Sequence, residues 1–484
     1  MIMNSFNINK MKSLKYIGLV ILLSYFQSCN KDFLEPVPES AISSDSYFLN
    51  DEQIETAVIG VYDAVQGVNS TSLDDNRGVQ QEFYVTEMRS DNTRTKNQEG
   101  EAAQFESYSV TPNNGIVENY YRSAYNAIYR ANLVLANLGN ASESEAPRFE
   151  GEAKFIRAYS YFNLVRLFGD IPLVDRIIDP LDKITPFTRV ATSEVYELIV
   201  SDLETAAANL DNGEYARASK AAAEALLAKV HLTLGNYLAA QLLCENVMSY
   251  GYTLEPNFND IFYSEGNNEI IFAIVYNPGI EADSQDFSAE FMNGVGRTVG
   301  VNYVMDNAVT FLDDNGGDNR TPFSYRIDPF QPTQHQVVKY LPNGEDGGAD
   351  GKTFESDATL SGNDWVVLRY ADVLLMHVES ILAGGQDTSN GSAIASFQMV
   401  RDRAGLTDPV TTITKQELLD ERRAELAFEN QRLFDLLRFG EAQSVLSALS
   451  ATNGYPFTAT DLLLPIPQRE INLSNGVMEQ NPGY

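Results

Sequence analysis

The sequence KQELLDERRAELAFENQRLFDLLRFG, residues 415–440, carries the strongest structural signal in the chain. It predicts one long helix, with Thr414 as its N-cap and Gly440 just beyond its last turn. Leucines recur at intervals of seven and four residues and form one apolar stripe, while phenylalanines point in other directions. We therefore expect a central helix that is packed on several sides.

Charged side chains surround this stripe, and most of them lie three residues from an opposite charge. This spacing permits ion pairs along the helix surface, so a solvated helix is one interpretation. Because apolar residues occur on more than one face, we favour ion pairs that join this helix to its neighbours. The charged residues are Arg422, Arg423, Glu425, Glu429, Arg432, Asp435 and Arg438.

The composition excludes several classes of function. The chain has 484 residues and a formal net charge of -33, whereas binding to nucleic acid needs clustered Lys and Arg. It has only 3 His and 2 Cys, with no CxxC or HxxxH spacing. We therefore expect no nucleic-acid partner, no zinc site and no histidine-based catalysis.

The N-terminal residues 1–28 have the pattern of a lipoprotein signal peptide. Three lysines precede an apolar run over 16–26, which at about 11 residues is shorter than the roughly 20 that a membrane-spanning helix needs. A small residue precedes Cys29, which predicts cleavage there and acylation of Cys29, with an ordinary secretory signal as the alternative. Met1 or Met11 could be the true start. Residues 29–50 contain two prolines and are predicted to form an extended tether.

Residues 51–250 are predicted to be an N-terminal helical part, with a polar loop region at 69–114. The last two expected helices, 216–234 and 237–250, have the small residues and the turn of a tetratricopeptide-type pair. Any antiparallel helical hairpin is the alternative for that pair. The other helices are expected at 52–65, 116–138, 150–168 and 193–210.

Residues 251–365 have a different character, because short apolar runs alternate with clusters of Gly, Pro, Asn and Asp. We expect a loop-rich insertion with a few short strands, and we place ligand contacts there. Residues 366–484 return to a helical pattern and are predicted to pack on the same body. The predicted fold class is therefore mostly α, a tetratricopeptide-like helical-repeat scaffold with a loop-rich insertion lobe.

The chain resembles the SusD/RagB family of outer-membrane nutrient-binding lipoproteins from Gram-negative bacteria. Residues 377–378 depart from the family's usual pair, which affects packing more than function. The resemblance rests on motifs that occur in the family's order: Cys29, RAYSYFNLVRLFGDIPL at 157–173, LRYADVLLMHVES at 368–380, VRDRAGL at 400–406, ERRAELAFENQRLFDLLRFG at 421–440, and LLLPIPQREI with QNPGY at the end.

The resemblance implies a cell-surface lipoprotein of the outer membrane, held there by its lipid anchor. It implies that the protein captures an oligosaccharide and closes as a lid over a TonB-dependent transporter barrel of the SusC type. It also implies no catalysis and no cofactor. The strongly acidic composition favours a neutral glycan over an anionic one.

Sugar binding needs aromatic faces and polar groups on loops over a rigid frame. Two regions satisfy this description, 82–96 and 276–330. Arg94, Arg297 and Phe330 lie in them as further candidates. The predicted ligand contacts are Tyr84, Arg89, Asp91, Asn92, Tyr276, Phe291, Tyr303 and Tyr325.

The charged residues of the helical motifs are interpreted as buried or half-buried ion pairs between helices, not as acid–base groups. Two other functions stay open: a lipid-anchored helical-repeat scaffold that binds protein or peptide ligands, and a surface glycosidase or peptidase. The long insertion argues against the scaffold. The lack of GxSxG, HExxH or a Cys/His pair argues against the enzyme. The segment 313–324 fails the EF-hand calcium pattern, which leaves a flexible turn and a calcium site of another kind open, and we assign no metal.

Overall fold

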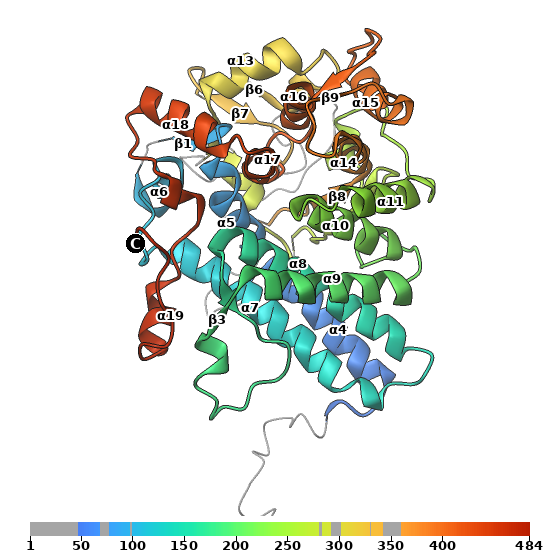
Figure 1. The fold of residues 1–484 in the computed structure, drawn as a ribbon, viewed down its shortest axis with the longest axis vertical. Coiled ribbons are helices and arrows are strands. Elements are labelled where there is room, and N and C mark those ends of the chain that lie inside the picture. The colour runs from blue at the N-terminus through green and yellow to red at the C-terminus, as the bar shows by residue number, and fades with distance from the viewer. Residues whose placement is uncertain are drawn as a thin grey trace, which may run out of the picture. The chain divides into compact units, whose positions relative to one another are not determined.

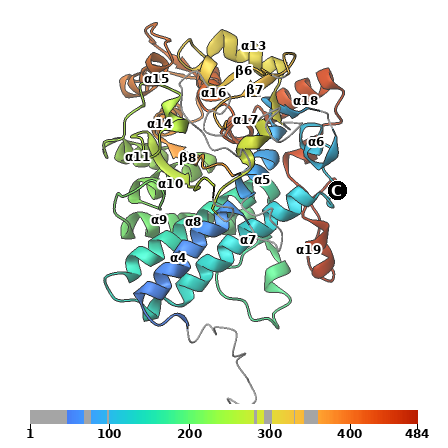
Figure 2. The same cartoon turned by 180° about the vertical axis from the view of Figure 1, so that it is seen from behind.

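The computed structural model describes residues 47–67, 77–96, 99–279, 283–291, 302–329, 331–341 and 360–484. The chain divides into two units, residues 1–49 and 50–484, and the fold below is that of the second unit (Figures 1 and 2). The predicted signal peptide, Cys29 and almost all of the predicted tether lie outside the described residues. No helix in the described ranges is long and apolar enough to cross a membrane.

Four long helices form the lower half of this unit in Figure 1. Their apolar periodicity buries one face of each, and α8, which lies between α7 and α9, is buried on nearly all sides. The side chain of Asn50 caps α4 by accepting a hydrogen bond from the Gln53 amide. The four helices are α4 (Asp51–Gln66), α7 (Gly115–Ala136), α8 (Ala146–Phe168) and α9 (Thr192–Asn209).

The predicted tetratricopeptide-like pair is present as α10 (Lys220–Thr233) and α11 (Tyr237–Met248). Ala225 and Ala228 are fully buried, so the two helices approach closely. Gly235 closes the turn in the left-handed conformation, with φ of 73°. Two further helices, α14 (Tyr370–Leu382) and α15 (Gly391–Arg403), continue the helical stack from α11. The mostly helical, repeat-like fold class is confirmed.

The prediction of one long helix over 415–440 is wrong. The structure has two helices, α16 (Lys415–Glu425) and α17 (Arg432–Phe439), joined by a turn in which Phe428 and Asn430 have positive φ values of 69° and 60°. The carboxylate of Glu87 accepts hydrogen bonds from the backbone amides of both turn residues, at 3.2 and 3.1 Å. A buried acceptor from a distant segment therefore replaces the helical carbonyls at this point.

The two ends of that stretch are as predicted. Thr414 forms a capping box with Glu417 at the start of α16. Gly440 follows α17 in the left-handed conformation, with φ of 77°. Sequence signals that act within one turn of a helix were therefore sufficient at both ends, whereas the break in the middle depends on a tertiary contact.

The charges of α16 join it to other elements, as predicted. Glu425 is completely buried and contacts three arginines, with Arg320 at 2.7 Å, Arg369 at 2.6 Å, and Arg403. Burial raises the pKa of the Glu425 carboxyl, but the three guanidinium groups outweigh it and hold that pKa well below the usual range. Glu429, which pairs with Arg369 at 2.7 Å, extends this set. We call these five residues the Glu425 network.

The polar region 69–114 is not mostly loop, so that prediction is wrong for its described residues. It contains four regular elements whose polar side chains are largely buried and bonded inside the protein. Polarity here reflects an internal hydrogen-bond network, which a composition argument cannot distinguish from exposure to water. The elements are α5 (Gly78–Val85), η2 (Glu87–Arg89), β1 (Thr93–Thr95) and α6 (Gly100–Glu106).

The insertion contributes short strands that pair with segments far away in sequence. β4 (Ile270–Ile274) pairs antiparallel with β8 (Trp365–Arg369), and β5 (Asn302–Val304) pairs antiparallel with β1. The second pairing sets Arg94 opposite Tyr303, so the two regions predicted to bind ligand are neighbours in space. The remaining pairs are β2 (Ile171–Pro172) with β3 (Arg189–Val190), β6 (Tyr325–Ile327) with β7 (His335–Val337), and β9 (Asp387–Thr388) with β10 (Ile413–Thr414).

Three further helices complete the parts of the unit that matter for ligand contacts. α13 (Asp306–Asn315) follows β5 at the top of Figure 1, and α18 (Ala442–Asn453) follows α17 on the left. α19 (Gln468–Leu473) lies lower on the same side, near the C-terminus. The shorter helical elements are α12 (Asp260–Tyr263), η3 (Leu138–Asn140), η4 (Thr185–Phe187), η5 (Phe287–Phe291), η6 (Thr321–Phe323) and η8 (Ala459–Leu462).

Candidate ligand-binding site

Seven of the eight predicted ligand contacts are buried in the structure. Their side chains contact other parts of the protein, so they do not present one open surface to a ligand. Two further candidates, Arg297 and Phe330, lie outside the described residues. The buried seven are Tyr84, Arg89, Asp91, Asn92, Tyr276, Phe291 and Tyr303.

Tyr84 illustrates why the ring is not available for stacking on a sugar. Its hydroxyl donates a hydrogen bond to the Glu290 carboxylate at 3.0 Å and accepts one from Gln80 at 3.1 Å. Its ring stacks on Phe105, with centroids 6.5 Å apart. Burial, followed by the charge of Glu290, raises the pKa of the Tyr84 hydroxyl well above its usual value. These contacts give Tyr84 a role in packing.

The polar candidates of the same segment are also held internally. Arg89 donates to the carbonyls of Val85 and Asp461, at 3.2 and 2.7 Å. Asp91 forms ion pairs with Arg423 at 2.9 Å and Arg432 at 2.8 Å. Burial raises the pKa of the Asp91 carboxyl, but these two arginines outweigh it and lower the pKa to about 2.

Asn92 belongs to the same internal arrangement. Its amide donates to the Glu87 carboxylate at 2.8 Å, and its oxygen accepts from Arg423 at 3.0 Å. Asp91 and Asn92 therefore fasten β1 to the turn and helices of the 415–440 stretch. Asp91 and Asn92 are 4% and 2% exposed, whereas the sequence prediction assumed that their side chains face a ligand on the surface.

Among the aromatic candidates of the insertion, Phe291 lies in a ring cluster in the protein interior, and Tyr276 and Tyr303 are also buried. Phe291 packs on Phe287 with centroids 4.9 Å apart, and Tyr340 joins Phe291 to Trp365. Tyr325, by contrast, is half-buried, and its hydroxyl donates to the Asp313 carboxylate. Tyr325 is thus the only predicted ligand contact among the described residues whose ring keeps substantial exposure.

An open groove nevertheless borders the predicted region. We call it the Arg94 groove, and its volume is about 480 Å³. It lies between β1, the start of α13 and one face of α18. Such a volume is in the range of ligand pockets in proteins. The groove is lined by Asp91, Arg94, Met305, Asp306, Asn307, Val445, Ala448, Leu449, Thr452 and Asn453.

One wall of the Arg94 groove is polar and held in place. The Arg94 guanidinium donates to the Gln334 side chain at 2.7 Å and to the Thr95 carbonyl at 3.2 Å. Asn307 donates to the Asp91 carbonyl at 2.8 Å and is itself exposed. This wall offers donors and acceptors in fixed positions, which suits the hydroxyl groups of a sugar.

The opposite wall comes from α18 and is largely apolar. Val445, Ala448 and Leu449 form it, with Thr452 and Asn453 at its end. Sequence reasoning missed this wall, because α18 has the ordinary amphipathic pattern of a packing helix. Only the fold shows that one of its faces borders a groove. An apolar face opposite a polar one matches the two kinds of surface on a pyranose ring.

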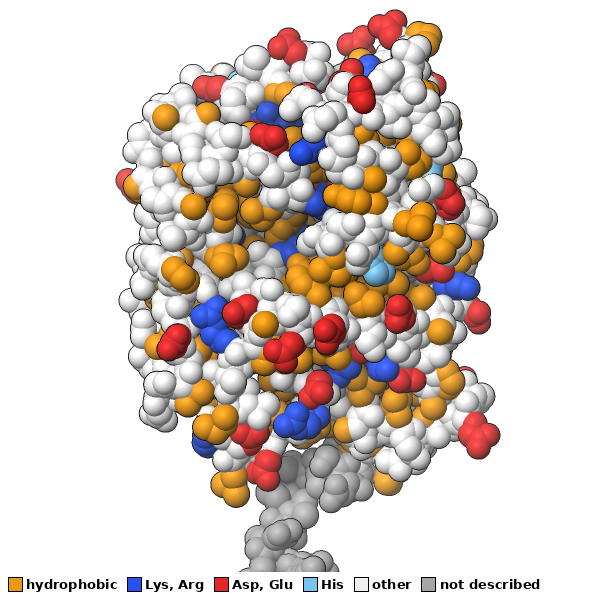
Figure 3. All heavy atoms as spheres, viewed as in Figure 1, with side chains coloured by type: hydrophobic (Ala, Val, Ile, Leu, Met, Phe, Trp, Pro, Cys, Tyr) orange, Lys and Arg blue, Asp and Glu red, His pale blue; other side chains and the backbone are white. Residues whose placement is uncertain are grey.

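Charged side chains are unevenly distributed over the face of the protein that Figure 3 shows. Figure 3 shows a hollow in the middle of one face in which hydrophobic side chains predominate and some basic ones occur, while acidic side chains lie mainly around it. No group of three or more His, Cys, Asp or Glu in the described part of the chain is placed to hold a metal ion.

Two family models match this chain. The model described as "Starch-binding associating with outer membrane" matches residues 32–232, and the model described as "SusD family" matches residues 332–484. SusD-like protein P2 of Formosa agariphila is 27% identical, over 98% of this chain and 100% of the relative. The starch-binding protein SusD of Bacteroides thetaiotaomicron is 24% identical, over 75% of this chain and 78% of the relative.

Solved structures agree with these matches. A laminarin-binding SusD-like protein has a TM-score of 0.74 at 25% identity, and the match covers 90% of this chain and 100% of that one. Surface glycan-binding protein A from Bacteroides thetaiotaomicron, solved in complex with laminarihexaose, has a TM-score of 0.73 at 22% identity, covering 89% and 99%. The second likeness concerns the fold alone.

Proposed function

Because the chain belongs to the SusD/RagB family, we propose that it captures a neutral glycan at the cell surface and delivers it to a TonB-dependent transporter of the outer membrane. The Arg94 groove is the observation that carries this proposal. It combines a fixed polar wall with an apolar wall in a volume of about 480 Å³. Capture needs these two surfaces and no acid–base pair, so the proposed role is non-catalytic binding.

A neutral glucan is the substrate class that we propose. The net charge of -33 disfavours a polyanionic glycan, because like charges repel at long range. A relative of the same fold is described as laminarin-binding, and another as starch-binding. Laminarin and starch are both neutral glucans, which agrees with the expectation from charge. We propose laminarin as the first ligand to test.

The location that we propose is the outer leaflet of the outer membrane. Acylation of Cys29 would anchor the chain there, and two or three acyl chains would hold it stably. The description of one matching family model supports association with the outer membrane. The transporter partner follows from the family and stays part of the proposal.

The test is calorimetry of a chain that starts after Cys29, against laminarin, starch and an anionic polysaccharide. We expect binding to a neutral glucan and none to the anionic one. Asn453→Ala and Asp306→Asn change exposed groove residues, and we expect each to weaken binding several-fold. Leu242→Ala on α11 is the matched control, since Leu242 is 60% exposed and lies outside the groove. If the protein binds none of these glycans, the proposal is contradicted.

A protein-binding scaffold is the second candidate function. Three leucines near the tetratricopeptide-like pair are exposed, Leu234 by 40%, Leu238 by 81% and Leu242 by 60%. Exposed apolar patches on helical repeats often bind proteins. This second function is favoured by two results together. The protein binds none of the glycans, and Leu238→Ser weakens binding to the purified transporter while Asn453→Ala does not.

A further inference from the structure

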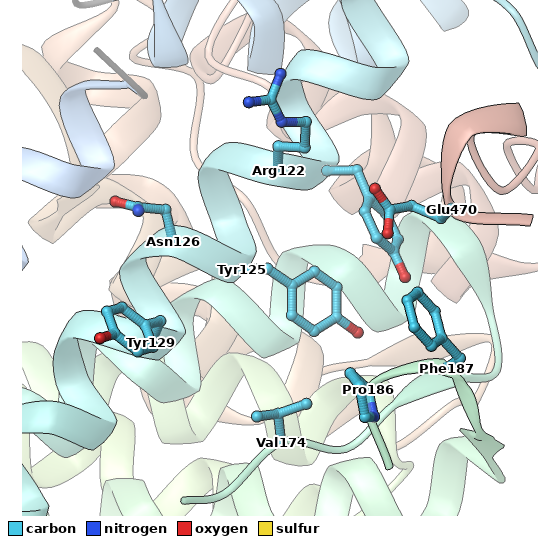
Figure 4. A pocket seen from close by; sticks show the side chains of 9 residues that line it. Arg122, Tyr125, Asn126, Tyr129, Val174, Pro186, Phe187 and Glu470 are labelled. Atoms are coloured by element: carbon cyan, nitrogen blue, oxygen red, sulfur yellow. The ribbon is translucent and has the colours of Figure 1, made fainter. Parts of the chain in front are cut away.

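We propose that the protein has a second carbohydrate site, a tyrosine-lined groove between α7, the segment 172–187 and α19, which binds a short stretch of a neutral glycan chain. This inference rests on the proposed glycan capture and adds a site that is separate from the Arg94 groove. We call it the tyrosine groove (Figure 4). It is lined by Tyr121, Arg122, Tyr125, Asn126, Tyr129, Val174, Pro186, Phe187 and Glu470.

Helix α7 supplies the aromatic floor of the tyrosine groove. Tyr121, Tyr125 and Tyr129 are spaced by four residues, which places them on one face of the helix. The rings of Tyr121 and Tyr125 are 4.8 Å apart between centroids. The Tyr125 hydroxyl donates to the Pro172 carbonyl at 2.8 Å, so this ring is held in position. Tyr129 is 51% exposed and offers its ring to solvent.

The opposite wall comes from η4 and the chain that precedes it. Figure 4 shows the rings of Tyr125 and Phe187 on either side of the space, with Val174 and Pro186 below and Tyr129 at the far end. The volume is about 380 Å³, which is within the range of ligand pockets. Preformed aromatic walls of this kind bind the apolar faces of a sugar ring at little cost in conformational entropy.

Polar groups lie at the edge of this aromatic space. The side-chain oxygen of Asn126 is buried and has no hydrogen-bond partner among the described residues. Figure 4 shows this amide directed away from the space between Tyr125 and Phe187, so the polar ligand contacts of the groove come from other residues. Glu470 and Arg122 stand on the rim, and burial raises the pKa of the Glu470 carboxyl. The rim therefore offers the Glu470 carboxylate as an acceptor and the Arg122 guanidinium as a donor.

The chemistry of the groove favours a neutral sugar over other ligands. An anionic ligand would meet the carboxylates of Glu470 and Glu118, and Arg122 is already shared with Glu118 at 3.9 Å. A purely apolar ligand would not use the polar rim. Aromatic faces combined with polar groups at the rim match a pyranose, which has C–H faces and equatorial hydroxyls.

Helices that border the two grooves, α18 and α19, lie on the same side of the protein. Figures 1 and 2 both place α18 and α19 on that side, with α7 reaching toward it from the helical half. A long glycan chain that engages both sites would bind more tightly than one confined to either, because the second contact becomes intramolecular. A short oligosaccharide would instead fill the two sites independently.

The first experiment is calorimetry with laminarihexaose on the chain that starts after Cys29. We expect two molecules bound per protein. Tyr129→Ala and Phe187→Ala should each weaken one of the two sites about tenfold, because each removes a stacking face. Tyr129→Phe keeps the ring and should bind like the unchanged protein, and Leu242→Ala is the control for truncation of an exposed apolar side chain.

The second experiment locates the sugar directly. Hydroxyl-radical footprinting with and without laminarihexaose should show protection of Tyr129 and Phe187. If the glucan binds with one molecule per protein, and Tyr129→Ala and Phe187→Ala change nothing while Asn453→Ala weakens binding, the second site is overturned and the proposed function stands. If the unchanged protein binds no glycan at all, the proposed function fails, and this inference fails with it.

A third outcome would assign the tyrosine groove to protein contacts. If Tyr129 becomes protected as the protein concentration rises, without any glycan, and Tyr129→Ala abolishes that protection together with dimer formation, the occupant is a second copy of the chain. That result would overturn the carbohydrate assignment even if glycan binds elsewhere. Protection that depends on laminarihexaose at constant, dilute protein concentration supports it.

Discussion

The Glu425 network and the two grooves use the same kinds of residue in opposite ways. In the network, each charged group has its partners inside the protein, and Arg320, Arg369 and Glu425 are at most 1% exposed. In the grooves, Arg94 and Tyr129 keep side-chain surface that no other part of the described protein covers. We infer that residue type alone does not separate binding residues from structural ones, and that side-chain exposure is the better criterion. Substitutions that separate stability from glycan binding test this distinction.

The largest effect is expected in the network. Glu425→Ala leaves three buried arginines without their shared partner, and we expect a loss of about 3–5 kcal/mol in the free energy of unfolding. Chemical denaturation measures this loss. Glu204→Gln, on the exposed face of α9, is the control and should change stability by less than about 0.5 kcal/mol. A loss of similar size in both variants would show that Glu425 has no special structural role.

A buried carboxyl in the insertion, that of Asp364, gives the next effect, through pH. Burial, the largest cause, raises the pKa of Asp364 from 3.8 to about 7, although its two oxygens accept from the Tyr276 amide and the Tyr215 hydroxyl. The folded protein thus keeps a proton that the unfolded chain has lost, so stability should fall as pH rises from about 4 to 7 and then level off.

The matched variant for this effect is Asp364→Asn, which stays neutral at every pH. The difference in unfolding free energy between it and the unchanged protein should grow by a few kcal/mol across the window from pH 4 to 7. Denaturant titrations at several pH values provide the measurement. Parallel pH profiles for the two proteins would show that Asp364 does not titrate in this window.

The cap of α16 gives a smaller effect. Thr414→Ala removes one half of the capping box with Glu417, and we expect a loss of about 1 kcal/mol in stability without any change in glycan binding. Thermal unfolding and calorimetry with laminarihexaose together measure both quantities. Thr414→Ser, which keeps the capping hydroxyl, should stay close to the unchanged protein. If Thr414→Ala weakens glycan binding, the α16 cap affects the glycan site, although the proposed grooves do not include Thr414.

The sequence was sufficient for features that depend on local spacing. Apolar periodicity predicted α4, α7 and α8, and the capping box at Thr414 and the glycine after α17 followed from their own turns. The structural role of the charges on α16 was also predictable, because apolar residues on several faces imply burial. These inferences need only neighbours within one helix.

The sequence was not sufficient where a distant partner decides the outcome. The break between α16 and α17 needs the carboxylate of Glu87, and the burial of Tyr84 needs Glu290 from the insertion. The Arg94 groove was half predicted, since its polar wall lies in the expected segment while its apolar wall comes from α18. No periodicity marks a helix face that borders a groove instead of a core.

The smallest effects on stability should come from substitutions in the grooves. These substitutions test most directly whether the groove residues differ in role from the Glu425 network. Tyr129→Ala and Asn453→Ala remove exposed side chains whose loss leaves no buried group without a partner, so stability should change by less than about 0.5 kcal/mol. Glycan binding should nevertheless weaken in both, which is the reverse of the pattern expected for Thr414→Ala. Chemical denaturation measures the stability of each variant, and calorimetry on the same samples measures its glycan binding. If Tyr129→Ala costs several kcal/mol, the α7 tyrosines belong with the Glu425 network as packing residues, and weaker binding in that variant would reflect a damaged fold instead of a lost contact.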